Sequence, residues 1–163
     1  MILYPDLYLK SVEDITIEIL NKNNIKGLIL DIDNTLIDYD KNLPDSVIKW
    51  CEALKAQGIK MCILSNTNKI NKVKKVANAL NLEYIYFAHK PNKKGFYQAK
   101  EILQLDNENI AVVGDQVFTD VLGGNRCNMF TILTVPMDKR DILLTKIKRP
   151  FEKIITKRLK INN

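Results

Sequence analysis

Residues 27–36 read GLILDIDNTL, a short apolar run that ends in two aspartates separated by one residue. The run is long enough for a buried strand and too short to predict a helix. A strand that is apolar on both faces is typical of a parallel sheet with helices on both sides. Asp31 and Asp33 would then lie just past the carboxyl end of this strand, where open α/β sheets bind ligands. The alternative is that Asp33 and Asn34 only form a turn.

Strands alternate with helices along the rest of the chain. Apolar segments predict five strands, at 25–31, 59–64, 84–87, 110–113 and 129–135. Apolar residues at helical spacing predict helices that begin near Asp45 and Ile70, a helix over 95–104 and a shorter one over 117–125. This alternation predicts βαβ units and a three-layer, doubly wound α/β fold around a five-stranded parallel sheet.

We expect a single domain over residues 1–163, because this length suits one domain with a substantial core. Residues 1–24 form an entry segment before the first predicted sheet strand. Ser11 and Asp14 have the spacing of a capping box. They predict a short helix with an apolar face made of Val12, Ile15 and Ile19.

Positive charge is concentrated in the C-terminal tail, residues 139–163. The net charge is +6, and residues 139–160 carry nine Lys or Arg against two Asp or Glu, so the remainder is close to neutral. The lysines at 69, 72, 74 and 75 are expected to form a solvated helix face. A basic amphipathic helix in the tail would suit an anionic membrane surface, and the alternative is a helix packed on the body with its lysines in water.

Composition excludes several kinds of site. His89 is the only histidine, so neither a zinc cluster nor, without a G-x-S-x-G elbow, a Ser-His-Asp triad is expected. The Asp-x-Asp pair lacks the glycine and the distal glutamate of a calcium loop. No apolar run approaches the roughly 18 residues that span a membrane. The widely spaced cysteines favour reduced thiols and a cytoplasmic location; they are Cys51, Cys62 and Cys127.

Polar groups follow each of the first four predicted strands. Because the carboxyl ends of parallel strands meet at one edge of a sheet, these groups can converge. Carboxylates about 4 Å apart repel by about 4 kcal/mol at an effective dielectric near 20, so a cluster favours a bound cation. Oxygen ligands suit a hard ion such as Mg²⁺. The groups, in chain order, are Asp31 and Asp33, Ser65, Lys90, and Asp115 with Asp120 five residues later.

Four ordered segments carry a resemblance to a known family. LILDIDNTL, ILSN, AHKP and VVGDQVFTD resemble, in order and spacing, the haloacid dehalogenase (HAD) superfamily of aspartate-dependent phosphatases. The wider sequence, including Asp6 and residues 119–126, is similar to the YqeG-type branch of its subfamily IIIA. That branch is related to phosphatidylglycerophosphate phosphatases. The resemblance extends to about residue 150 and implies a HAD-like Rossmannoid fold.

The resemblance also implies a role for each residue. Asp31 would be the nucleophile that forms an aspartyl-phosphate, and Asp33 would protonate the leaving oxygen and then activate water. The Asp31 carboxylate, the Asp33 backbone carbonyl and Asp115 would bind Mg²⁺, with Asp120 supporting the metal from behind. The phosphoryl oxygens would be held by Ser65, Asn66 and Lys90, with Lys93 or Lys94 as alternatives to Lys90.

The intervals between motifs leave no room for a cap domain. Residues 35–65 hold one loop, one helix and one strand, and residues 65–90 hold one helix and one strand. An open site suits a bulky phosphorylated substrate. The resemblance therefore predicts a capless, Mg²⁺-dependent phosphatase, with phosphatidylglycerophosphate as the first candidate substrate and possible contact with the inner face of the membrane. A nucleic-acid-end phosphatase and a non-enzymatic phospho-acceptor or scaffold module are alternatives.

Overall fold

The computed structural model describes residues 2–138, and a six-stranded, fully parallel sheet runs through them. The strand order is β1-β6-β5-β2-β3-β4. The strands are β1 (Leu7–Leu9), β2 (Gly27–Leu30), β3 (Lys60–Leu64), β4 (Glu83–Ile85), β5 (Ile110–Gly114) and β6 (Phe130–Thr134). The predicted α/β class with a parallel sheet is confirmed.

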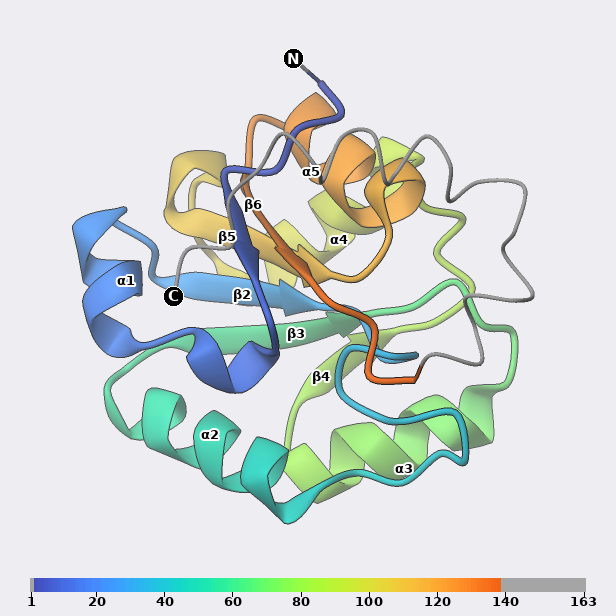
Figure 1. The fold of residues 1–163 in the computed structure, drawn as a ribbon. Coiled ribbons are helices and arrows are strands. Elements are labelled where there is room, and N and C mark those ends of the chain that lie inside the picture. The colour runs from blue at the N-terminus through green and yellow to red at the C-terminus, as the bar shows by residue number, and fades with distance from the viewer. Residues whose placement is uncertain (1, 139–163) are drawn as a thin grey trace.

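Helices cover both faces of the sheet (Figure 1). One face carries the 3₁₀ turn η1 (Val12–Asp14), α1 (Ile17–Lys22), α2 (Asp45–Ala56) and α3 (Ile70–Leu80). The other face carries α4 (Lys93–Leu103) and α5 (Leu122–Arg126). A 3₁₀ turn, η2 (Asn107–Asn109), precedes β5, and a π-helical turn, η3 (Val117–Val121), precedes α5. The predicted three-layer arrangement is therefore confirmed.

Two apolar cores lie on opposite faces of the central strands. Leu28 and Leu30 of β2 pack into the core beneath α2 and α3, whereas Ile29 packs into the core beneath α4. The same alternation occurs along β3 and β5. Because successive side chains of a strand point to opposite faces, a continuous apolar run supplies both cores at once. Each fully buried Leu or Ile side chain contributes about 1.5–3 kcal/mol.

The prediction of five strands is wrong by one, since β1 forms a sixth at the edge beside β6. Leu7 is level with Ile132 in this pair. The Asp6 N–H donates to the Thr131 carbonyl oxygen at 2.9 Å, and the Thr131 N–H donates to Asp6 Oδ2 at 2.8 Å. Three residues are too few to show a strand period, so this strand depends on its distant partner.

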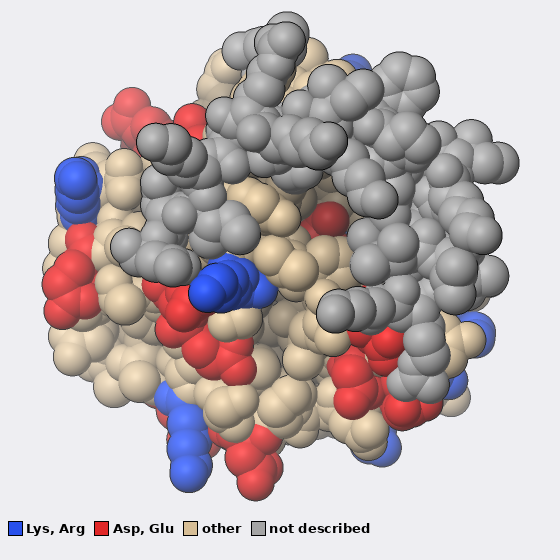
Figure 2. Space-filling view, in the orientation of Figure 1, with Lys and Arg blue, Asp and Glu red and all other residues tan. Residues whose placement is uncertain are grey.

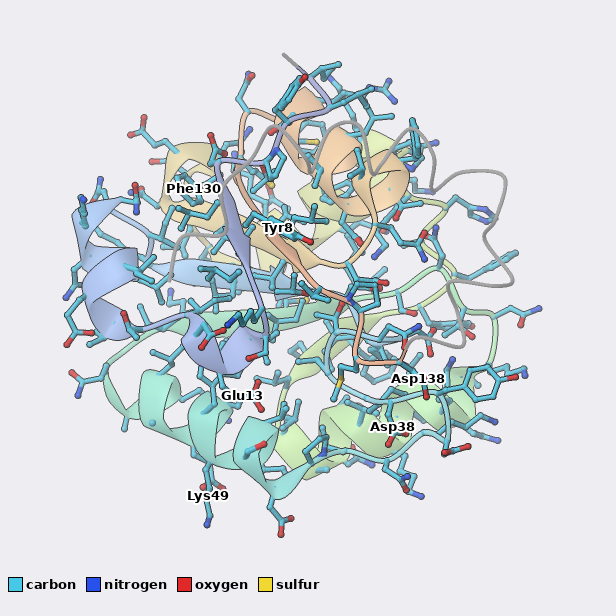
Figure 3. The ribbon with its side chains drawn as sticks, in the orientation of Figure 1. Tyr8, Glu13, Asp38, Lys49, Phe130 and Asp138 are labelled. Carbon is cyan, nitrogen blue, oxygen red and sulfur yellow. The ribbon has the colours of Figure 1, made fainter. Side chains whose placement is uncertain are left out.

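The entry helix also differs from its prediction. The Ser11 N–H donates to Asp14 Oδ2 at 3.2 Å, but this capping box encloses only the single turn η1. The helix begins later, at Ile17, where Thr16 provides the cap. Glu13 of η1 points toward α2 (Figure 3), and its Oε1 accepts a hydrogen bond from Ser46 Oγ at 2.8 Å. The turn is therefore fixed by a contact with a neighbouring element.

The strand predicted over 84–87 ends early, at Ile85. Phe87 has a φ of 50°, in the left-handed region, and its N–H donates to the Thr67 carbonyl oxygen at 2.8 Å. The chain thus turns toward the loop after β3. Since this segment leads directly to Lys90, the turn brings the lysine to the carboxyl edge of the sheet.

Each interval between the motifs holds one helix and one strand, as predicted for a chain without a cap. The interval from Thr35 to Ser65 contains α2 and β3, and the interval from Ser65 to Lys90 contains α3 and β4. The carboxyl edge of the sheet is therefore not covered by an inserted domain between these residues.

The basic tail predicted over residues 139–163 lies outside the described residues. Within residues 2–138, no helix combines the length and the apolar character needed to cross a membrane.

Candidate active site

The two central strands end side by side where the chain changes direction across the sheet. After β2 the chain adds β3 and β4 on one side, and it then adds β5 and β6 on the other. Leu30 is level with Val113, and the Asp31 N–H donates to the Val113 carbonyl oxygen at 3.0 Å. Asp31 follows β2 and Asp115 follows β5, so both lie at the topological switch point, where α/β sheets bind ligands.

Lys90 bridges two carboxylates at this edge. Its Nζ lies 2.8 Å from Asp31 Oδ1 and 2.6 Å from Asp120 Oδ1, and only 7 % of the residue is exposed. Neither Lys93 nor Lys94 forms an ion pair with a carboxylate in the part of the chain that the structure describes. Of the three lysines considered from the sequence, Lys90 is the one that reaches the cluster.

Asn66 and Ser65 lie on the loop after β3, beside Lys90. The Lys90 N–H donates to Asn66 Oδ1 at 2.6 Å, and Asn66 Nδ2 donates to the Lys90 carbonyl oxygen at 3.1 Å. Asn66 therefore positions Lys90 through its main chain, a contact that the sequence did not predict. Ser65 is buried, and its Oγ accepts from the Thr67 N–H at 3.2 Å. The serine hydroxyl can still donate its own hydrogen to a ligand.

Asp120 reaches the cluster because η3 is wound as a π-helix. The Asp120 and Val121 N–H groups both donate to the Gln116 carbonyl oxygen, at 3.0 and 3.3 Å. Asp120 Oδ2 accepts from the Gln116 N–H at 3.2 Å, which fixes the carboxylate. Gly114 provides the space, since a Cβ atom there would overlap the Asp120 carboxylate. Local π turns of this kind are frequent at functional sites.

Three carboxylates converge closely enough to share one cation. One oxygen from each of Asp31, Asp115 and Asp120 lies within 4.8 Å of the others, and all three residues are at most 9 % exposed. Thr35 Oγ1 donates to Asp115 Oδ1 at 3.5 Å. With all groups ionised and Lys90 counted, the cluster carries a charge of −2. Asp120, predicted to support the metal from behind, offers an oxygen to the same position as the other two.

Asp33 lies outside this group of carboxylates. Its Oδ1 forms an ion pair with Lys72 Nζ at 2.7 Å, and its side chain is 46 % exposed, compared with 15 % for Lys72. The loop continues through Asn34, whose φ is 60° and whose N–H donates to the Ile37 carbonyl oxygen at 2.9 Å. The Asp33 carboxyl is therefore the acid of this motif that is open to solvent.

Comparison with known proteins agrees with this geometry. A family model described as haloacid dehalogenase-like hydrolase matches residues 36–128, more than half of the chain. The probable phosphatase YqeG of Bacillus subtilis (strain 168) is 42 % identical over 157 residues, which are 96 % of this chain and 91 % of that protein. The chain belongs to the haloacid dehalogenase-like hydrolases. The family predicted from the four motifs is confirmed.

Two further proteins are similar to this HAD hydrolase. The mitochondrial phosphatidylglycerophosphatase GEP4 of Saccharomyces cerevisiae (strain ATCC 204508 / S288c) is 32 % identical over 137 residues, covering 74 % of this chain and 71 % of that protein. The crystal structure of an uncharacterized protein from Listeria monocytogenes serotype 4b has a TM-score of 0.57 at 17 % identity, covering 82 % of this chain and 99 % of that chain. At that identity the structural likeness shows the fold alone.

Burial strongly shifts the pKa values of ionisable groups in the HAD site. Burial raises the pKa of Asp31 to about 7, with Lys90 opposing the rise and Asp120 adding to it. Burial and the charge of Asp31 raise the pKa of Asp115 well above its usual value. Burial lowers the pKa of Lys90, but the carboxylates of Asp120 and Asp31 outweigh it, so the net pKa lies above the ordinary value. The lysine therefore stays charged and does not fully compensate the acids.

One residue of this HAD site was assigned incorrectly from the sequence. Lys72 was expected on a solvated helix face, but it is mostly buried and bound to Asp33. A signal was present, because Lys72 directly precedes Val73 and lies four residues before Val76, and both valines are buried. A lysine at that spacing flanks the apolar stripe of the helix rather than facing directly away from it.

Proposed function

We propose that this HAD hydrolase is a Mg²⁺-dependent phosphatase that cleaves phosphomonoesters through an aspartyl-phosphate on Asp31. The observation that carries the proposal is the convergence of Asp31, Asp115 and Asp120 around Lys90 at the switch point of the sheet. Such a cluster would hold a divalent cation and a phosphoryl group together. Metal and lysine charges can then act on the transferring group in a partly dehydrated site.

The donor set fits Mg²⁺. The three carboxylates offer only oxygen atoms, which hard cations prefer. Their ligand oxygens lie within 4.8 Å of one another, and the cluster charge of −2 is the charge that a divalent ion neutralises. Asp31 and Asp115 would bind the ion together with the Asp33 carbonyl oxygen, and Asp120 would act as a further or supporting ligand. Bound Mg²⁺ would polarise a phosphoryl oxygen.

Asp31 and Asp33 would divide the chemistry between them. An Asp31 carboxylate oxygen attacks phosphorus, and the bond from phosphorus to the leaving oxygen breaks. The more exposed Asp33 carboxyl gives its proton to that oxygen. Asp33 then takes a proton from water as the water cleaves the acyl phosphate. This releases inorganic phosphate and restores both carboxyl groups.

The remaining polar groups would hold the phosphoryl oxygens during transfer. Lys90 Nζ already lies 2.8 Å from the nucleophile, so a phosphoryl group on Asp31 comes within its reach. The Ser65 hydroxyl would donate a hydrogen bond from the end of β3. Asn66 would keep Lys90 in place and can offer its second amide hydrogen to the substrate.

We favour phosphatidylglycerophosphate as the substrate, because a relative named phosphatidylglycerophosphatase shares 32 % identity with this chain. We expect room for a bulky molecule beside the site. A hollow of about 550 Å³ borders Thr35, which donates to Asp115, and its wall combines polar side chains with the exposed apolar residues Val135 and Met137. Acyl chains or a lipid surface would suit these side chains better than a small polar metabolite.

The charge distribution gives less support to a nucleic-acid end as the substrate. On the face shown in Figure 2, the described Lys and Arg side chains stand apart, whereas Asp and Glu gather over its lower part. Asp38, on the loop after β2, belongs to this side of the molecule (Figure 3). A phosphate backbone requires a continuous basic surface, and the described residues that are visible on this face do not form one.

The test is phosphate release by the full chain, with Mg²⁺ or with EDTA, from p-nitrophenyl phosphate and from phosphatidylglycerophosphate in vesicles. We expect Mg²⁺-dependent release that Asp31→Asn abolishes. Asp106→Asn, which removes an exposed carboxyl just before β5, at the opposite edge of the sheet, is the matched control and should keep wild-type activity. Release from the small ester alone would reject the lipid substrate. A covalent phosphate on Asp31 that lasts for hours would favour the phospho-acceptor alternative.

A further inference from the structure

The ion pair between Lys72 and Asp33 joins two separate elements beside the site. Lys72 lies in the first turn of α3, and Asp33 lies on the loop after β2. Their Nζ and Oδ1 atoms are 2.7 Å apart, and the lysine is the less exposed partner. A long cationic side chain is thus held beside an acid that remains open to solvent.

Helix stability does not account for a lysine at this position. The first turn of α3 contains no acidic residue, and it contains Lys72. The N-terminus of a helix carries partial positive charge, so an acid is favoured there and a lysine is disfavoured. The placement of Lys72 is better explained by what its ammonium group meets at the site.

The positive charge of Lys90 is already neutralised by neighbouring acids, so Lys90 is not available to bind a second anionic group of the substrate. It is buried and is shared between Asp31 and Asp120, and in the proposed reaction it would also bind the transferring phosphoryl group. Among the described residues, Lys72 pairs with one carboxylate, and nearly half of that partner's side chain is exposed. Lys72 is therefore the cation positioned to meet the rest of the substrate.

We propose that Lys72 forms a subsite for a second phosphate group on the leaving portion of the substrate. The inference rests on the proposed function, in which Asp33 protonates the leaving oxygen. That oxygen must then lie against the Asp33 carboxyl, and the next atoms of the leaving group come within reach of Lys72 Nζ. Lys72 selects substrates whose leaving group is itself anionic.

The geometry also limits the spacing of the two phosphates. The path runs from the leaving oxygen to the Asp33 carboxyl, then to Lys72 Nζ, and then to a second anion. It is about three hydrogen bonds long when extended, and shorter when bent. A linker of about three atoms between the two ester oxygens is shorter than the extended path and covers it when the path is bent. The glycerol of phosphatidylglycerophosphate is such a linker, with a phosphodiester at its other end. A soluble bisphosphate presents the same chemistry without the lipid.

The experiment compares propanediol carrying a phosphate at one end with propanediol carrying a phosphate at both ends. The quantity measured is the ratio of kcat/KM for the two compounds, with Mg²⁺. Wild type should prefer the bisphosphate, and Lys72→Met should reduce that preference by about tenfold or more, as expected for loss of a hydrogen bond to a charged group. Lys72→Arg should retain most of the preference. Lys69→Met, which removes an exposed charge adjacent to the same turn, should leave the ratio unchanged.

The outcomes distinguish a role of Lys72 in binding the second phosphate from a role in the reaction that both compounds undergo. A Lys72→Met variant that slows both compounds equally would show that Lys72 acts only through Asp33, and the inference would fail. Equal use of both compounds by wild type would also reject it. If wild type hydrolyses neither, the phosphatase proposal fails, and calorimetric binding of the same two compounds to wild type and Lys72→Met decides the subsite. A further arm with vesicles of phosphatidylglycerophosphate distinguishes a lipid from a soluble bisphosphate as the source of the second phosphate.

Discussion

Replacing Lys90 with methionine should destabilise the protein strongly. Methionine keeps much of the volume of the lysine stem but removes the charge between Asp31 and Asp120. At 2.8 and 2.6 Å, each pair contributes about 6 kcal/mol of Coulomb attraction at an effective dielectric near 20. Desolvation of the lysine offsets much of this gain. Removal of one partner of a buried pair costs about 3–5 kcal/mol, and we expect Lys90→Met to lose that amount near pH 8 in EDTA.

The loss should shrink in acid. Without Lys90 the facing carboxylates must stay uncompensated or take up protons, and burial already raises the pKa of Asp31 to about 7. A carboxyl with a raised pKa in the folded state costs stability above that pKa, and the cost disappears as pH falls toward the value of the unfolded chain. The difference between Lys90→Met and wild type should therefore be smaller near pH 5 than near pH 8.

Urea unfolding followed by circular dichroism measures both effects. With a slope near 2 kcal/mol per molar urea, the expected loss moves the midpoint by about 2 M near pH 8. Lys94→Met is the matched control, because Lys94 is exposed and makes no ion pair with the described carboxylates; it should shift stability by less than about 0.5 kcal/mol. A loss for Lys90→Met as small as that of the control would refute the reasoning. So would an equal loss at the two pH values.

Three other changes test separate parts of the site. Asp31→Asn should lower phosphate release at least about a thousandfold with an unchanged circular dichroism spectrum, and appreciable residual turnover would mean that another residue is the nucleophile. Gly114→Ala should lower both kcat and the melting temperature, with a loss of about 1–3 kcal/mol, because the new methyl group displaces the Asp120 carboxylate; wild-type values would contradict the close approach. In EDTA the melting temperature should fall from about pH 5 to pH 8, because ionisation of the buried Asp31, whose pKa is raised, costs stability. Stabilisation by Mg²⁺ should grow over the same range. A Mg²⁺ effect that does not change with pH would argue against metal binding by this carboxylate.

The central part of the fold was predictable from local pattern. The apolar runs that became β2, β3 and β5 are buried on both faces, and a parallel sheet with two helical layers requires this. Asp31 and Asp115 could be placed at one edge because each directly follows such a run. Helices α2 and α3 could be recognised because their apolar residues repeat with the helical period.

The elements that were missed depend on contacts between distant residues. β1 has only three residues and exists because Asp6 and Leu7 pair with β6, 125 residues further along. The capping box at Ser11 closes one turn rather than a helix, because the chain must next pack Ile15 into the core. No local period signals either feature.

The sequence motifs predicted the family, and local pattern predicted five of the six strands in chain order and the acids at the carboxyl edge of the sheet. The strands and acids could be placed because apolar runs and the residues that follow them are local features of the sequence, whereas the family rested on the resemblance of four motifs. The packing of the folded chain places Asp120 in the cluster, on a π turn over Gly114, and pairs Lys72 with Asp33. The partner of a long side chain depends on the space and the charge that the packed elements leave around it. The spacing of neighbouring residues along the sequence specifies neither of these.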